Sequence, residues 1–167
     1  MKILIAEDEV DMLDLYKVAL EEGGHSVVVT TNGQDCVAVY QQAIKGLKSK
    51  ASPFDAVVLD YRMPKMDGME AARKILSINP EQRIIFASAF VKETLVESIK
   101  ELHQVVELMQ KPFAASALLD TIEDKEIYDG LKSLMVNVRE IKDTNPSHKN
   151  IKELFEGLRK IQKGRTF

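Results

Sequence analysis

Four short apolar runs of the sequence end in side chains that could do chemistry. These side chains are the acidic pair Glu7 and Asp8, the carboxylate of Asp60, the hydroxyl of Ser88 and the ammonium of Lys111. Three carboxylates that lie close together repel one another, each pair by about 4 kcal/mol at a separation of about 4 Å and an effective dielectric constant of about 20. A hard divalent cation such as Mg²⁺ compensates for this repulsion. With the ammonium and the hydroxyl nearby, such a cluster would bind a phosphoryl group, with one carboxylate as the nucleophile.

The elements that would bring these side chains together follow from the pattern of apolar residues. Short apolar runs predict strands at 2–6, 26–30, 56–60, 83–87 and 105–109. Helical spacing predicts helices at 10–20, 36–47, 69–76, 91–102 and 114–122, the first with an apolar face of Val10, Leu13, Val18 and Leu20. This strict alternation predicts an α/β fold in which helices cover both faces of a five-stranded parallel, doubly wound sheet. The carboxyl ends of the strands then share one edge, which is where such sheets bind ligands.

Asp60 has two interpretations. An Asp that ends a strand is, taken alone, better explained as a cap for the following turn or helix. The polar residues at the other strand ends favour the second interpretation, in which Asp60 is the nucleophile of a phosphoryl site. The sequence around Asp60, with Pro64 and Gly68 in the loop that follows, is compatible with both.

The four motifs, in this order, resemble the receiver domains of response regulators, the phosphoacceptor half of two-component signalling. The resemblance rests on the acidic pair Glu7 and Asp8, on D-x-x-M-P-x-x-D-G from Asp60 onward, on Ser88 within Ala-Ser-Ala, and on Lys111 followed by Pro and Phe. It covers roughly residues 1 to 124. It implies a receiver domain over 1–124 with the flavodoxin-like strand order 2-1-3-4-5 found in chemotaxis regulators.

The resemblance also implies a ligand set and a reaction. Asp60 would accept a phosphoryl group from a sensor histidine kinase or a phosphotransfer protein. Asp8, Asp60 and the backbone carbonyl of Arg62 would hold Mg²⁺ directly, and Glu7 would reach the ion through water. Lys111 would neutralise charge on the phosphoryl group during transfer.

A switch of protein contacts is the further implication of the resemblance. Ser88 would move toward the phosphoryl group and Lys111 would pair with it, which would remodel the surface of the fourth helix, fifth strand and fifth helix. Related domains often carry Tyr or Phe three residues before the Lys, but this sequence has Leu108 there, and Phe90 is the nearest aromatic candidate. The family usually has a cis bond between the Lys and the Pro, here Lys111 and Pro112.

The segment 125–167 lies beyond the resemblance. Apolar residues recur at steps of three and four in 127–141 and again in 151–161, with Asn145-Pro146 between them. This pattern predicts two amphipathic helices in a hairpin. The segment is too short for a winged-helix output domain. Two short apolar stripes must pack on the receiver domain or on another chain, and we favour self-association as a homodimer. Docking on the fifth helix and an atypical DNA-binding or other output module are the alternatives.

Composition limits the classes of function. The single Cys36 cannot form an internal disulfide, and the sequence contains neither a signal peptide nor an apolar stretch long enough to span a bilayer, so we expect a cytoplasmic protein without a membrane partner. Residues 1–125 carry 14 Lys and Arg against 20 Asp and Glu, and residues 126–167 carry 9 against 6. An excess of three basic residues is too small to indicate nucleic-acid binding.

Three hypotheses for the function remain. The first is a signalling module that phosphorylates and dephosphorylates itself on Asp60, has no other enzymatic output and acts through protein contacts. The second is a magnesium-dependent phosphatase of the haloacid-dehalogenase type. It is disfavoured because that family needs D-x-D at the nucleophile, and Arg62 occupies the second position. The third is a degenerate receiver that only binds partners, which the complete set of motifs disfavours.

Overall fold

Five parallel strands form the centre of the molecule. The computed structural model describes residues 1–47, 51–89, 98–99, 101–102, 104, 106–125 and 129. The strands are β1 (Lys2–Ala6), β2 (Ser26–Thr30), β3 (Ala56–Asp60), β4 (Ile84–Ser88) and β5 (Val106–Gln110), in the order β2-β1-β3-β4-β5. This order is the one that the resemblance implied. The first three strands have the predicted bounds, and β4 and β5 each begin one residue later than predicted.

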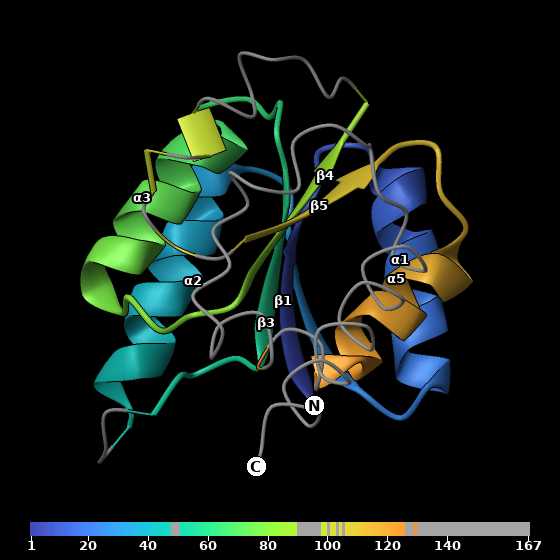
Figure 1. The fold of residues 1–167 in the computed structure, drawn as a ribbon, viewed down its shortest axis with the longest axis horizontal. Coiled ribbons are helices and arrows are strands. Elements are labelled where there is room, and N and C mark those ends of the chain that lie inside the picture. Colours follow the sequence, from blue (N-terminus) through green and yellow to red (C-terminus); the bar gives the residue numbers. More distant parts are fainter. Residues whose placement is uncertain are drawn as a thin grey trace, which may run out of the picture. The chain divides into compact units, whose positions relative to one another are not determined.

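Helices cover both faces of the sheet. They are α1 (Val10–Glu22), α2 (Gly33–Lys45), α3 (Gly68–Ile78) and α5 (Ala115–Glu123). In Figure 1, α2 and α3 lie on one face, and α1 and the start of α5 lie on the other. The helix predicted at 91–102 lies mostly outside the described residues, as does the predicted C-terminal hairpin. Met1–Leu119 form one compact unit; of the second, Asp120–Phe167, the described residues are 120–125 and 129.

Side-chain caps explain where α2 and α3 begin. The Asn32 side-chain oxygen accepts a hydrogen bond from the Asp35 backbone N–H at 2.9 Å, and the Asp67 carboxylate accepts one from the Glu70 backbone N–H at 2.8 Å. Each bond satisfies a backbone donor that the first turn of a helix leaves without a partner. Asp67, which contributes to the motif after Asp60, therefore has a structural role at the start of α3.

Alternation along the strands decides which side chains reach which face. Leu4 of β1 and Leu59 of β3 belong to the core beneath α2 and α3. Successive side chains of a strand point to opposite faces, so Asp60, one position after Leu59, is directed toward the α1 face. Leu108 packs, partly buried, against the α2 and α3 core.

The buried face of α1 differs from the predicted one. Leu13, Tyr16 and Leu20 are its buried residues, whereas Val10 and Val18 are 57% and 52% exposed. The prediction was therefore wrong for these two valines. Successive residues of an α-helix are rotated by about 100° around its axis, so two positions correspond to about 200°. Val18, two positions from both Tyr16 and Leu20, therefore lies on the opposite side of α1.

A network of buried polar groups lies at the amino end of the sheet. The Tyr40 hydroxyl donates to the Gln82 side-chain oxygen at 2.9 Å and accepts from the Asn79 amide at 3.3 Å. The Gln82 amide donates to the carbonyl oxygen of Phe54 at 3.0 Å, just before β3 begins. These bonds satisfy polar groups that would otherwise be costly to bury.

Gly33 allows α2 to approach the loop that follows β3. Its N–H donates to the carbonyl oxygen of Met66 at 3.1 Å, and a Cβ on Gly33 would collide with that same oxygen.

We expect Gly33→Ala to lower the free energy of unfolding by about 1–3 kcal/mol, measured by urea denaturation, because the backbone has to shift. The control is Gly46→Ala, where the nearest atom to the added Cβ is 3.5 Å away. It should change stability by less than about 0.5 kcal/mol, and equal losses in the two variants would contradict the prediction.

Candidate functional site

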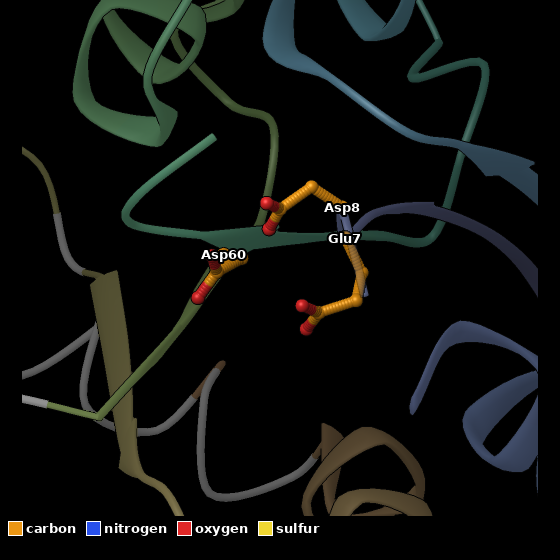
Figure 2. A group of neighbouring side chains, drawn as sticks. All are labelled: Glu7, Asp8 and Asp60. Atoms are coloured by element: carbon orange, nitrogen blue, oxygen red, sulfur yellow. The ribbon is translucent and has the colours of Figure 1, made fainter. Parts of the chain in front are cut away.

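Three carboxylates meet at the carboxyl edge of the sheet. Glu7 and Asp8 directly follow β1, and Asp60 ends β3, which pairs with β1 through Ala6 and Leu59. Carboxylate oxygens of the three residues lie within 4.8 Å of one another. Figure 2 shows the three side chains gathered at the ends of these two strands. The side chains predicted to converge from these two strand ends are therefore brought together.

Lys111 completes this cluster from the end of β5. Its ammonium donates to Glu7 Oε2 at 2.6 Å and to Asp60 Oδ1 at 3.1 Å. The side chains of Lys111, Glu7 and Asp60 are only 11%, 2% and 10% exposed, so water screens these ion pairs little. The Lys111–Pro112 peptide bond is cis, as the resemblance implied.

Burial dominates the electrostatics of the cluster. Burial raises the pKa of Asp60 and of Glu7, although Lys111 acts in the opposite direction on both. Burial also acts to lower the pKa of Lys111, but the hydrogen bond to Glu7 and the charges of Asp60 and Glu7 outweigh it, and the pKa is raised. Three carboxylates and one ammonium carry a formal charge of minus two when all are ionised. A divalent cation with oxygen ligands fits this donor set in both charge and chemistry.

The loop after Asp60 is held by backbone contacts. The Tyr61 N–H donates to the Ala87 carbonyl oxygen at 3.2 Å, and the Gly68 N–H donates to the Tyr61 carbonyl oxygen at 3.0 Å. A Cβ on Gly68 would collide with the carbonyl oxygen of Asp60, so this position requires glycine. Lys65 has a φ of 65°, in the left-handed region that few side-chain-bearing residues adopt. The loop is thus fixed directly beside the carboxylate.

The remaining predicted site residues lie around the cluster. Ser88 ends β4, is 3% exposed, and its carbonyl oxygen accepts the Lys111 backbone N–H at 2.8 Å. Arg62 lies two residues beyond Asp60 and is exposed. The hydroxyl role of Ser88 and the carbonyl role of Arg62 stay predictions. Phe90, the candidate aromatic switch, lies outside the described residues.

The fold and the cluster agree with a match between the sequence and a known family. Residues 3–123 match the family described as "Response regulator receiver domain". The chain belongs to the response-regulator receiver family. Receiver domains bind Mg²⁺ at an acidic pocket, and Glu7, Asp8 and Asp60 form such a pocket here.

Relatives of known sequence or structure share the receiver domain. The response regulator receiver protein CpdR of Brucella abortus is 31% identical over 122 residues, which cover 73% of this chain and 93% of CpdR. The transcriptional regulatory protein ZraR of Salmonella typhimurium is 29% identical over 122 residues, 72% of this chain but only 25% of ZraR. CheY in the CheX-CheY-BeF3-Mg+2 complex of Borrelia burgdorferi matches with a TM-score of 0.64 and 25% identity, over 74% of this chain and 87% of CheY. The similarity thus spans nearly all of CpdR but a quarter of ZraR.

Sequence reasoning missed two residues of this receiver domain. Tyr16 is buried on α1 and stacks on Phe113, but it was not among the apolar residues assigned to the first helix, and Gly33 was assigned no structural role. The spacing of Leu13, Tyr16 and Leu20, three and then four residues apart, is a helical signal that could have identified Tyr16.

Among the described residues, no helix is long and apolar enough to cross a membrane.

The raised carboxyl pKa values predict how stability depends on pH. A carboxyl group whose pKa is higher in the folded chain than in the unfolded chain favours folding at low pH, and this contribution is lost as pH rises through the folded pKa. With a chelator present, we expect the melting temperature to fall as the pH rises above the ordinary carboxyl range, about pH 4.5, because Glu7 and Asp60 then ionise against their raised pKa values. Asp60→Asn should flatten the profile because Asn does not titrate. A wild-type melting temperature that is constant or rises over this range would contradict the prediction.

Proposed function

We propose that this receiver domain accepts a phosphoryl group on Asp60 from a sensor histidine kinase or phosphotransfer protein and changes its protein contacts in response. The observation that carries the proposal is the Asp60 carboxylate, held 3.1 Å from the Lys111 ammonium inside a cluster of three carboxylates. A carboxylate that served only as a turn cap would not need two further carboxylates and a buried lysine around it. The family to which the chain belongs supports the same function.

The phosphoryl transfer follows from the chemistry of these groups. An Asp60 carboxylate oxygen attacks the phosphorus of a phosphohistidine as the P–N bond breaks. The electron pair of that bond stays on the imidazole nitrogen, which then takes a proton. Lys111 stabilises negative charge on the oxygens of the transferring group from a position already beside the nucleophile. Attack of water on the same phosphorus later breaks the bond between phosphorus and the Asp60 oxygen, releases inorganic phosphate and returns Asp60 to a carboxylate, so the chain performs both steps on its own side chain.

The proposed Mg²⁺ ligands are Asp8, Asp60 and the backbone carbonyl of Arg62, with Glu7 contributing through water. The ion, when bound, offsets the repulsion among the carboxylates and the charge of the phosphoryl oxygens. Asp8 is exposed, whereas Glu7 is 1% exposed and already bonded to Lys111. This difference in exposure supports direct contact for Asp8 and indirect contact for Glu7.

The proposed response is a shift of Ser88 and Lys111 toward the phosphoryl group, which changes the surface around β5. We propose that the segment 125–167 carries this change to a second copy of the chain, and that residues 1–124 are the receiver domain proper. An atypical DNA-binding or other output role for the segment is the alternative. Sedimentation of the full chain and of residues 1–124, with and without a phosphodonor, separates these possibilities.

Labelling with a small phosphodonor tests the nucleophile. Acetyl phosphate should phosphorylate the wild-type protein in the presence of Mg²⁺ and not in the presence of a chelator, as followed by intact-protein mass spectrometry. Asp60→Asn should abolish the added mass because the amide is not a nucleophile at this step. Asp55→Asn is the matched control, since Asp55 is exposed and its carboxylate accepts a bond from Lys2 N–H at 2.7 Å, outside the cluster. Undiminished labelling of Asp60→Asn would refute the assignment.

Replacement of the lysine separates catalysis from metal binding. Lys111→Met should lower the rate of labelling by acetyl phosphate by about tenfold or more, the effect of losing one group that stabilises charge in the transition state. Its Mg²⁺ affinity, measured by calorimetry, should be unchanged or tighter because a positive charge has left the pocket. A large loss of Mg²⁺ affinity would instead make Lys111 part of the metal site.

A further inference from the structure

Tyr16 is a buried aromatic residue that the proposed reaction does not use. It lies on α1, is 1% exposed, and its ring stacks on that of Phe113 with centroids 5.3 Å apart and planes 13° apart. Phe113 follows Lys111 by two residues. The stack therefore fixes the position of the Tyr16 ring relative to the segment that carries the lysine.

The Tyr16 hydroxyl lies on the same side of the sheet as the acidic cluster. Side chains of a helix lean toward its amino terminus, and α1 begins directly beyond Glu7 and Asp8, so the ring leans toward the carboxyl edge of the sheet. Burial raises the pKa of Tyr16 to about 12, and the charges of Lys111, Glu7 and Asp60 also act on the group. The phenol is thus within the electrostatic field of the site.

The Tyr16 hydroxyl is buried and has no hydrogen-bond partner within the described part of the chain. Tyr40, which is also fully buried, has two partners for its hydroxyl, Gln82 and Asn79. A buried donor without a partner is destabilising, and in a native structure it calls for an explanation. Phe at this position would keep the ring stack without that cost.

Glu7 is one of the charged groups that act on Tyr16, and its partner changes in the proposed reaction. Its side chain is 2% exposed and accepts the shortest bond of the cluster, from Lys111 at 2.6 Å. If Lys111 turns to a phosphoryl oxygen on Asp60, this buried carboxylate loses its strongest donor and keeps the long bond from the Glu9 backbone N–H, at 3.4 Å. Burying an ionised group with too few donors is costly.

We propose that Tyr16 is a positioning residue whose hydroxyl is held in reserve in the free protein and donates to the Glu7 carboxylate when Lys111 turns to the phosphoryl group. The inference rests on the proposed function of Asp60. The stack on Phe113 keeps the hydroxyl in place in both states. The hydroxyl that is unsatisfied before phosphorylation becomes satisfied after it, so Tyr16 favours the phosphorylated arrangement.

The test compares two identical chemical changes, Tyr16→Phe and Tyr40→Phe, with beryllofluoride and Mg²⁺ as the phosphoryl mimic. Without the mimic, Tyr16→Phe should melt at or above the wild-type temperature, whereas Tyr40→Phe should melt lower because it breaks bonds that exist. The dissociation constant for beryllofluoride, measured by calorimetry, should rise about tenfold for Tyr16→Phe, the effect of one hydrogen bond to a charged group. For Tyr40→Phe it should stay within about twofold of wild type.

The outcomes distinguish this inference from the function beneath it. A wild-type protein that does not bind beryllofluoride with Mg²⁺ overturns the proposed function, and the inference with it. Wild-type binding that is retained at full affinity by Tyr16→Phe overturns the inference and leaves the function of Asp60 in place. A free Tyr16→Phe protein that melts as low as Tyr40→Phe also overturns it, because the hydroxyl would then be satisfied before phosphorylation.

Discussion

Repulsion among three carboxylates at one edge of a parallel sheet is the constraint on which the rest of the molecule depends. Glu7, Asp8 and Asp60 are brought within 4.8 Å by the pairing of β1 with β3, and two of them are buried. One lysine, from a strand at the far edge of the sheet, offsets part of this charge. Burial raises the pKa of Glu7 and of Asp60 even with Lys111 beside them, and the four groups together carry a net negative charge when ionised, which leaves the pocket suited to a cation.

The two edges of the sheet have opposite properties. At the amino edge, Tyr40, Asn79 and Gln82 satisfy one another, and the buried Arg83 forms a two-pronged ion pair with Glu107 at 2.7 and 2.8 Å. At the carboxyl edge, charges of the same sign crowd together and a buried hydroxyl lacks a partner among the described residues. A reactive site requires polar and charged groups whose hydrogen bonds and charge a ligand completes better than the protein does. The contacts that stabilise the fold are therefore concentrated at the opposite edge.

The sequence predicted the sheet and its cluster because strong local signals coincide there. The run Ala56–Asp60 is buried throughout, and a parallel strand covered on both faces is a continuous apolar run, here Ala56–Leu59 up to the Asp60 carboxylate, so its bounds were predicted correctly. On the exposed side of α1 the apolar Val10 and Val18 gave a false signal, since single apolar residues on a surface are common. Local helical spacing identifies Tyr16 as a residue of the buried face of α1, but its contact with Phe113, 97 residues away, is contained in no local pattern.

One backbone hydrogen bond bears on how sharp the response of this receiver domain can be. The Lys111 N–H donates to the Ser88 carbonyl oxygen at 2.8 Å, so the two residues expected to contact the phosphoryl group are tied to each other at the ends of neighbouring strands. A displacement of one backbone is transmitted to the other without any side chain in between. Independent residues would give a graded output with partly switched forms. Under the proposed function, two that move as a unit would give an all-or-none output, in which phosphorylation of Asp60 would set the fraction of molecules that signal.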